Sequence, residues 1–323
     1  MKLAIGFITY GELTAKYLPY FLDSLKKQNF SDYKIFAIDD SEQEENNNKK
    51  FIKNNYPEID FSWAGENLGF GRAFNVLIKK ASEIGAEYFL VLNPDIIMEP
   101  GAIEKLVEAM DGDRTLGSAS PKILKWNFLE NKKTNIIDTC GIGLKTGLRF
   151  FDFGQGEIDK GQYNKVDILG PSGAAGIYRI SALEKLNPLG KGGKGDSLYF
   201  DESMFMYKED CDLAFRLKLA NFKARLVPEA IFYHDRTVAS AGKGFMAFFR
   251  GRKAKNRQAK KWSFLNQHII FLKYWRFQGV FSKITIILRI LAMFIFALLF
   301  EQYLLGEYGK LKVIRKKLTN FNI

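Results

Sequence analysis

Residues 87–95, EYFLVLNPD, form an apolar run of strand length that ends in an Asn-Pro-Asp turn. Two earlier runs have the same character, LAIGFIT at 3–9 and KIFAID at 34–39. Unbroken apolar runs of this kind are typical of strands buried on both faces of a parallel sheet. Helical periodicity appears between and after them, at residues 18–28, 45–55 and 70–84. This alternation of strands and helices predicts an α/β fold with a parallel sheet covered by helices.

Polar side chains follow each of these predicted strands. Thr9 ends the first strand, Asp39 and Asp40 end the second, and Asn93 and Asp95 follow the third. The carboxyl ends of parallel strands meet at one edge of the sheet, and ligands of open α/β sheets bind there. The sequence therefore predicts a ligand site at this edge.

The usual glycine-rich phosphate loops are missing from the sequence. It contains no GxxxxGK[ST] motif, and the Gly-Phe-Gly at 69–71 lacks the third glycine of a dinucleotide-binding turn. A nucleotide diphosphate would then need a metal ion in place of a backbone cradle. Asp95, fixed on a turn by Pro94, is a candidate ligand for a hard divalent cation that also binds diphosphate oxygens. Taken alone, this turn is equally compatible with a plain turn or a helix cap.

A longer pattern places these residues in context. Residues 200–217 read FDESMFMYKEDCDLAFRL, and residues 227–234 read VPEAIFYH. With the earlier motifs, and over about residues 3–240, the chain resembles the family-2 inverting glycosyltransferases of the GT-A fold, in particular their rhamnosyltransferase-like branch. The residues that carry the resemblance are Thr9-Tyr10, Asp39-Asp40-Ser41, Asn67-Leu68-Gly69-Phe70, Asn75, Asn93-Pro94-Asp95, Gly173, Glu209-Asp210, Arg216 and His234.

The resemblance implies a nucleotide-sugar-binding GT-A fold with a mostly parallel central sheet, followed here by a basic helical tail. It implies transfer of a sugar from dTDP-rhamnose or a UDP-sugar to a glycan or polyprenyl-linked acceptor in cell-surface polysaccharide synthesis. The family pattern places the catalytic base at Asp210, which removes the proton of the attacking acceptor hydroxyl. The alternative is that the acidic residues at 209, 210 and 212 only complement a helix dipole. We expect that role for Asp212, paired with Arg216 four residues on.

The resemblance also implies roles for the other motif residues. His234 would join Asp95 in holding Mg²⁺ or Mn²⁺, and a histidine ligand favours Mn²⁺. Either Asp39 or Asp40 can accept the imide N–H of uracil or thymine. Arg72 is expected either to reach the ribose or phosphates or to be a solvated side chain. The full set of expected substrate-binding residues is Thr9, Asp39, Asp40, Asn67, Gly69, Arg72, Asn93, Gly173 and Glu209.

The net charge of +12 is concentrated at the C-terminal end of the chain. Residues 241–323 hold 17 Lys and Arg against two Glu, whereas residues 1–240 carry a net charge of −3. The nearly neutral body argues against nucleic-acid binding. The basic tail also contains an apolar stretch at 284–300, interrupted by Thr285 and Arg289, and this combination indicates an anionic membrane surface as a partner. A buried core helix and a membrane span are the alternatives.

We therefore predict a catalytic domain over 1–240 and a membrane-associating region over 241–323, attached peripherally at the cytoplasmic face of the membrane. Two cysteines cannot form a disulfide framework and no N-terminal apolar signal region is seen, which is consistent with a cytosolic catalytic part. Two other function classes remain open. One is a nucleotide-sugar-binding scaffold without turnover. The other is a nucleotidyltransferase, for which residues 9–16 lack the basic glycine-rich loop that a triphosphate requires.

Overall fold

A computed structural model describes residues 1–186, 199–236, 252 and 256–318. The chain forms two compact units. The first, called the sheet unit below, comprises Met1–Gly143, Asp152–Glu202 and Glu209–Thr237. The second, the helical unit, comprises Leu144–Phe151, Ser203–Lys208 and Val238–Ile323. Two short stretches from the first 240 residues thus cluster with the C-terminal residues.

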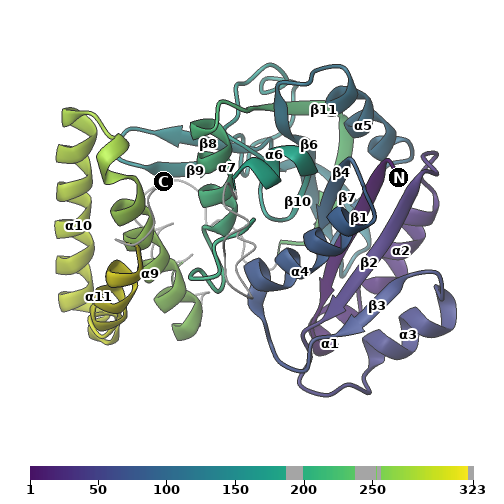
Figure 1. The fold of residues 1–323 in the computed structure, drawn as a ribbon, viewed down its shortest axis with the longest axis horizontal. Coiled ribbons are helices and arrows are strands. Elements are labelled where there is room, and N and C mark those ends of the chain that lie inside the picture. The colour runs from purple at the N-terminus through teal and green to yellow at the C-terminus, as the bar shows by residue number, and fades with distance from the viewer. Residues whose placement is uncertain (187–198, 237–251, 253–255, 319–323) are drawn as a thin grey trace. The chain divides into compact units, whose positions relative to one another are not determined.

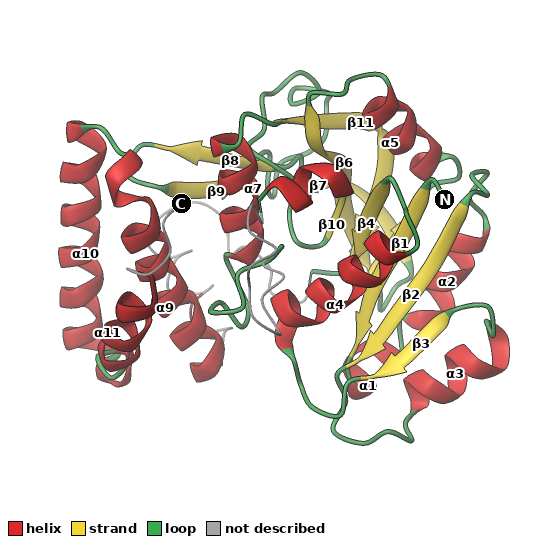
Figure 2. Ribbon diagram, viewed as in Figure 1, coloured by secondary structure: helices red, strands yellow, loops and turns green. Residues whose placement is uncertain are grey.

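The sheet unit is built on one large mixed sheet (Figures 1 and 2). Its strand order is β3-β2-β1-β4-β10-β6-β11-β5, and β7 pairs with β6. The first four strands of this order are parallel, as the sequence predicts, but β10 runs antiparallel to both β4 and β6. The strands are β1 (Leu3–Thr9), β2 (Tyr33–Asp39), β3 (Asp60–Trp63), β4 (Tyr88–Leu92), β5 (Ile96–Met98), β6 (Leu116–Asn127), β7 (Lys132–Thr139), β10 (Ala175–Arg179) and β11 (Lys223–His234).

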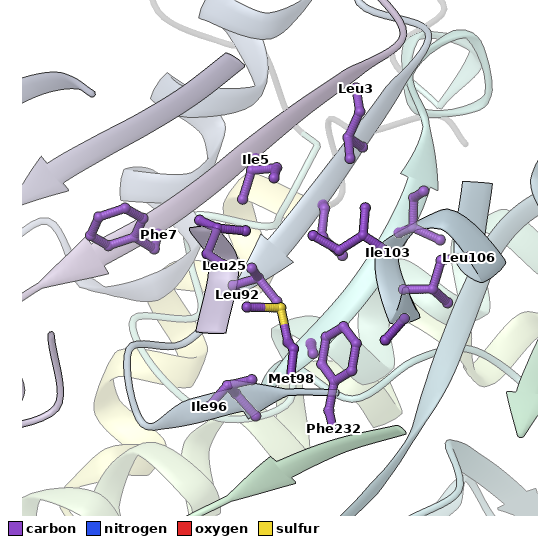
Figure 3. Close-up of a cluster of buried hydrophobic side chains, with 14 of the residues drawn as sticks. Leu3, Ile5, Phe7, Leu25, Leu92, Ile96, Met98, Ile103, Leu106 and Phe232 are labelled. Atoms are coloured by element: carbon purple, nitrogen blue, oxygen red, sulfur yellow. The ribbon is translucent and has the colours of Figure 1, made fainter. Parts of the chain in front are cut away.

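Helices cover both faces of this sheet. They are α1 (Gly11–Ala15), α2 (Leu18–Lys26), α3 (Asn47–Asn55), α4 (Gly69–Glu83), α5 (Ala102–Asp111), α6 (Ile180–Lys185) and α7 (Glu209–Leu219). Leu3, Ile5 and Phe7 of β1 pack with α2 and α5 on one face (Figure 3), whereas Ala4 packs with α4 on the other. Because alternate residues of β1 are buried on opposite faces, its sequence is apolar throughout.

Gly6 lies where β1 meets β4. A Cβ atom at this position would lie 2.3 Å from the ring of Phe89. Glycine at this position therefore leaves room for the Phe89 ring against the neighbouring strand.

The helical unit contains three long helices, with a β-hairpin tip packed on one of them. Its helices are α9 (Arg257–Tyr274), α10 (Val280–Phe300) and α11 (Glu307–Leu318), with 3₁₀ turns at Trp275–Phe277 and Gln302–Leu304. The hairpin consists of β8 (Ile142–Lys145) and β9 (Arg149–Asp152). By length and composition alone α10 is able to cross a membrane, and only 11% of its apolar window is buried.

Candidate functional site

Asp39 and Asp40, at the end of β2, differ in how their carboxylates are used. The oxygens of Asp39 accept hydrogen bonds from the backbone N–H and hydroxyl of Ser41 and from the Asn46 amide. Asp40 is buried, and its Oδ1 has no hydrogen-bond partner in the part of the chain that the structure describes. Because buried polar atoms are normally paired, this oxygen is suited to accept a ligand N–H. Asp40 thus has an oxygen available to a ligand, whereas both oxygens of Asp39 already accept hydrogen bonds.

The pKa of Asp40 is perturbed by its surroundings. Burial, aided by the negative charge of Asp39, raises it to about 7, and the backbone N–H groups of Leu68 and Gly69 and the charge of Arg72 oppose this rise. A carboxyl group with a pKa near 7 changes its charge within the physiological range. Asp40 is also tied to β1, since its backbone N–H donates to the carbonyl of Thr9 over 2.9 Å.

The turn before α4 lies beside Asp40. Asn67 Oδ1 accepts the N–H of Gly69 over 3.0 Å, and Gly69 has a left-handed φ of 72° that favours glycine. This turn directs the backbone N–H groups that influence Asp40. Arg72 follows on α4, where its half-exposed side chain pairs with Glu66 at 3.2 Å. Both expectations for Arg72 remain predictions.

Asp95 and His234 are brought together from distant parts of the sequence. Asp95 lies in the turn between β4 and β5, and His234 ends β11, which pairs with β5. Asp95 Oδ2 lies 3.2 Å from His234 Nε2, and the other ring nitrogen, Nδ1, lies 2.8 Å from Asp138 Oδ2. Burial alone would lower the pKa of His234, but the two carboxylates raise it to about 10.

Asp138, on β7, is a site residue that the sequence reasoning missed. It is fully buried, and Arg236 Nε lies 3.4 Å from its Oδ1. Although burial acts in the opposite sense, the hydrogen bond from His234 and the charge of Arg236 hold the pKa of Asp138 below its usual value. A carboxylate on one ring nitrogen of a histidine fixes the ring orientation and leaves the other nitrogen to face a ligand. The signal in the sequence was a carboxylate closing the apolar run at 136–138.

Asp210 stands in the first turn of α7, which runs over Glu209–Leu219. Its Oδ2 accepts the backbone N–H of Gly173 over 2.9 Å. A Cβ atom at Gly173 would lie 3.5 Å from Asp210 Oδ2 and 3.3 Å from the Phe70 ring, so a small residue suits this approach. Glu209 beside it is buried. The predicted pairing of Asp212 with Arg216 is confirmed, at 2.8 Å.

The segment before α7 is anchored to α4. The amide of Asn75 is hydrogen bonded to both the N–H and the carbonyl of Phe200, over 2.7 and 2.9 Å, and to the carboxylate of Glu202 over 3.1 Å. Asn75 is buried, and its two bonds to the Phe200 backbone are shielded from water. This residue of the sequence motif therefore fixes the chain that leads to Asp210.

A backbone hydrogen bond links the turn that carries Asp95 to the segment that contacts Asp210. The N–H of Asn93 donates to the carbonyl of Ala174 over 2.9 Å, which joins the Asp95 turn to the residue after Gly173. Thr9, which is buried, is paired with Asp39 in the β1–β2 ladder. Thr9, Asp39 and Asn93 thus lie at the ends of neighbouring strands of the sheet unit, whereas Gly69 and Glu209 begin α4 and α7.

The residues at Asp95 fit a divalent cation that is completed by substrate. Asp95 Oδ1 is buried and has no hydrogen-bond partner among the described residues, and His234 Nε2 lies beside the same carboxylate. Within the described ranges, no group of three or more His, Cys, Asp or Glu is placed to hold an ion alone. Mg²⁺ and similar ions in nucleotide sites commonly use one or two protein ligands plus phosphates and water. Asp95 and His234 suit that type of site, and an ion bound there would replace the proton on His234 Nε2.

Comparison with known proteins gives a consistent picture. A model of Glycosyl transferase family 2 matches residues 5–186, more than half of the chain. Two curated relatives, from strains CDC 1551 and H37Rv of Mycobacterium tuberculosis, are both named N-acetylglucosaminyl-diphospho-decaprenol L-rhamnosyltransferase. Each is 26% identical over 204 residues, which cover 56% of this chain and 60% of the relative. The chain therefore matches less than two thirds of their length.

Solved structures resemble the chain in fold. The crystal structure of GalNAc-T7 with UDP, GalNAc and Mn²⁺ matches with a TM-score of 0.53 and 15% identity, over 72% of this chain and 43% of that one. TarS 1–349 of S. aureus in complex with UDP matches with a TM-score of 0.48 and 19% identity, over 79% and 64%. The GalNAc-T7 match and the family model confirm the predicted α/β GT-A fold.

Proposed function

Because the chain belongs to glycosyl transferase family 2, we propose that it transfers a sugar from a nucleotide-diphosphate donor, with inversion, to an acceptor hydroxyl. The observation that carries the proposal is the Asp210 carboxylate. Its Oδ2 accepts the backbone N–H of Gly173. The next residue, Ala174, is hydrogen bonded to Asn93, in the turn that carries Asp95 beside His234. A base, a pair of side chains suited to a divalent cation and a buried acceptor for a nucleobase are groups that such a transfer can use.

In the proposed mechanism Asp210 acts as general base. The acceptor oxygen forms its bond to the anomeric carbon while the bond from that carbon to the diphosphate breaks, and the hydroxyl proton passes to Asp210. The Gly173 N–H fixes one carboxylate oxygen, so the proton goes to a group with a defined position. A divalent cation held by Asp95 and His234 would neutralise charge on the leaving diphosphate. Asp138 keeps His234 in the orientation for that role.

For the donor we propose dTDP-rhamnose or a UDP-sugar, and for the acceptor a polyprenyl-linked glycan. The names of the two mycobacterial relatives specify an L-rhamnosyl group and a diphospho-decaprenol-linked acceptor, which supports a rhamnosyl donor and a polyprenyl-linked acceptor. Uracil and thymine each present an imide N–H, which Asp40 Oδ1 is suited to accept. The test is a panel of nucleotide sugars incubated with purified protein and divalent metal, with released nucleotide as the readout. Binding without release for every donor would favour the scaffold alternative, and pyrophosphate release from a triphosphate would favour a nucleotidyltransferase.

Base recognition by Asp40 predicts a pH dependence. The pKa of Asp40 is raised to about 7, so the carboxylate form gains population as the pH rises from 6 to 8. A carboxylate accepts an N–H more strongly than a neutral carboxyl group does. We therefore expect uridine and thymidine to bind more tightly at pH 8 than at pH 6, measured by NMR titration. Nucleosides are used because they carry no titrating phosphate.

The matched control for this prediction is Asp40→Asn, in which the dependence on pH should vanish. Cytidine, which lacks the imide N–H, should bind weakly at both pH values. An unchanged uridine affinity between pH 6 and pH 8 in the wild-type protein would contradict the role of Asp40.

We also propose that the helical unit attaches the protein peripherally to the cytoplasmic face of an anionic membrane. The apolar side chains of α10 are exposed, and with about 3.6 residues per turn most of them share one face. The exposed residues are Val280, Phe281, Ile284, Ile287, Leu288, Leu291, Phe294, Ile295, Leu298, Leu299 and Phe300.

The tip of the β8–β9 hairpin contacts the first half of the opposite face of α10. The N–H of Gly147 donates to the Ser282 hydroxyl over 3.1 Å, and Arg289 donates to the Gly147 carbonyl. The exposed apolar side chains lie mainly on the other face, an amphipathic arrangement that favours a helix lying in the interface over a span.

Cations and aromatic rings gather where α10 begins. Arg276 lies over the ring of Phe277 at 4.9 Å, and Lys283 lies over the ring of Trp275 at 5.7 Å. Both aromatic side chains are exposed. Aromatic residues beside basic ones are typical of membrane–water interfaces, and the +15 charge of residues 241–323 is complementary to anionic lipid.

The membrane proposal predicts salt-sensitive sedimentation. We expect the protein to pellet with anionic vesicles at low salt and to be released in part at high salt, because salt screens exposed charges. Leu288→Glu with Leu291→Glu should abolish pelleting. Leu129→Glu is the matched control, since Leu129 is 94% exposed but lies outside the helical unit. Protein that stays in solution at low salt would contradict the proposal, and retention through high salt and carbonate would indicate a span.

A further inference from the structure

The backbone is strained just before the acidic start of α7. Tyr207 and Lys208 have φ values of 74° and 78°, in the left-handed region. Residues with a Cβ atom rarely adopt this region, and two in succession persist only where the surrounding structure holds them. The next residue is Glu209 and the one after it is Asp210. The strained turn therefore lies directly before the proposed base in the chain.

A buried amide in α9 holds the turn. Asn266 is 1% exposed, and its Nδ2 donates to the carbonyl oxygens of Met206 and Tyr207 over 2.9 and 2.7 Å. The two N–H bonds of a side-chain amide are its full donor capacity, so both are used on this segment. One turn earlier on α9, Trp262 stacks on Phe205 with ring centroids 4.8 Å apart. The same face of α9 therefore contacts three consecutive residues of the segment.

We propose that Asn266 is a positioning residue for Asp210, an inference that rests on the proposed function. Asn75 anchors the start of the segment at Phe200, and Asn266 anchors its end at Tyr207. Only two residues, Lys208 and Glu209, separate Tyr207 from Asp210, so a change in the backbone at Tyr207 is expected to shift Asp210. In this proposal the C-terminal region has a second role besides membrane attachment, which is to position the carboxylate of Asp210.

The first arm of the test removes the clamp. Asn266→Leu keeps a similar volume but donates no hydrogen bond, and a misplacement of about 1 Å near a reacting centre costs on the order of 10²-fold in rate. We expect kcat to fall roughly 10- to 100-fold by the same reasoning, with the KM for the donor and the affinity for its nucleotide unchanged. Asn266→Asp is nearly isosteric and cannot donate these hydrogen bonds, so its kcat should fall in the same way. This variant replaces Asn266→Leu if Asn266→Leu does not fold. Nucleotide affinity and thermal unfolding report folding.

The second arm asks whether relief of strain replaces the clamp. Glycine adopts a φ near 78° without a steric penalty, so Lys208→Gly in the Asn266→Leu background should restore much of kcat. Lys208→Ala in that background removes the same side chain but keeps the strain, and should restore nothing. A merely structural role of Asn266 within α9 would not be repaired at residue 208.

The outcomes are distinct. Wild-type kcat in both Asn266 variants, or equal recovery with Gly and Ala at 208, would overturn the inference. A wild-type protein that turns over no donor would overturn the proposed function, and this inference with it. Loss of kcat with selective rescue by glycine would establish Asn266 as a positioning residue.

Discussion

Replacing Asp210 by Asn is expected to lower turnover by ~10²–10⁴-fold, the usual contribution of a general base. Asn has the same shape and can still accept the Gly173 N–H, so the local structure should be kept. Donor binding does not use the proton-accepting function, and the nucleotide affinity should stay as in the wild-type protein. Steady-state release of nucleotide and calorimetry with the nucleotide diphosphate measure the two quantities separately.

Asp212 provides the control for this experiment. It lies on the same helix but is buried in an ion pair with Arg216. Breaking a buried pair costs roughly 3–5 kcal/mol of folding free energy. Asp212→Asn should therefore lower the unfolding temperature while the folded protein keeps its kcat. Wild-type turnover in Asp210→Asn would refute the assignment of the base.

The second large effect is expected at the proposed metal site. Asp95→Ala should weaken Mn²⁺ binding by at least the ~10–100-fold that follows loss of an outer-shell partner of a metal ligand. Because the cation would bridge protein and diphosphate, binding of UDP or dTDP should weaken in parallel, and chelation should have the same effect on the wild-type protein. Electron paramagnetic resonance of Mn²⁺ and calorimetry of the nucleotide measure the two events.

Two comparisons make this experiment specific. Asp138→Asn removes the partner of His234 Nδ1 without removing a proposed ligand, and should give an intermediate loss. Uridine, which has no phosphate, should bind equally well with and without chelator. If UDP affinity is the same with and without divalent metal, the site does not use a metal, and the interpretation of Asp95 is wrong.

Local sequence patterns predicted the parallel half of the sheet, whose strand ends carry the residues proposed to bind the nucleotide. The run at 3–9 forms β1 and the run at 34–39 falls within β2, since strands buried on both faces need apolar residues at every position. The position of Asp39 and Asp40 at a strand end could be predicted because the second apolar run stops there. The same reasoning found the turn at Asp95, because it depends only on where β4 stops.

What the sequence did not predict depends on long-range pairing. β10 enters antiparallel between β4 and β6, and β7 folds back on β6, so Asp138 reaches His234 from a distant part of the chain. No local period encodes such partners. Asn266 was missed for a related reason: a polar residue in a helix reads as solvent-facing until the chain segment that it bonds to is known.

The composition of the helical unit has a consequence for protein engineering. This unit is assembled from three separate stretches, and its helices α9 and α10 hydrogen bond to Met206 and Gly147, which come from the other two. A chimera that exchanged only residues 238–323 with those of a homologue would pair foreign helices with native loops. Recombination that preserves activity should therefore move all three stretches together, as one block that is discontinuous in the gene.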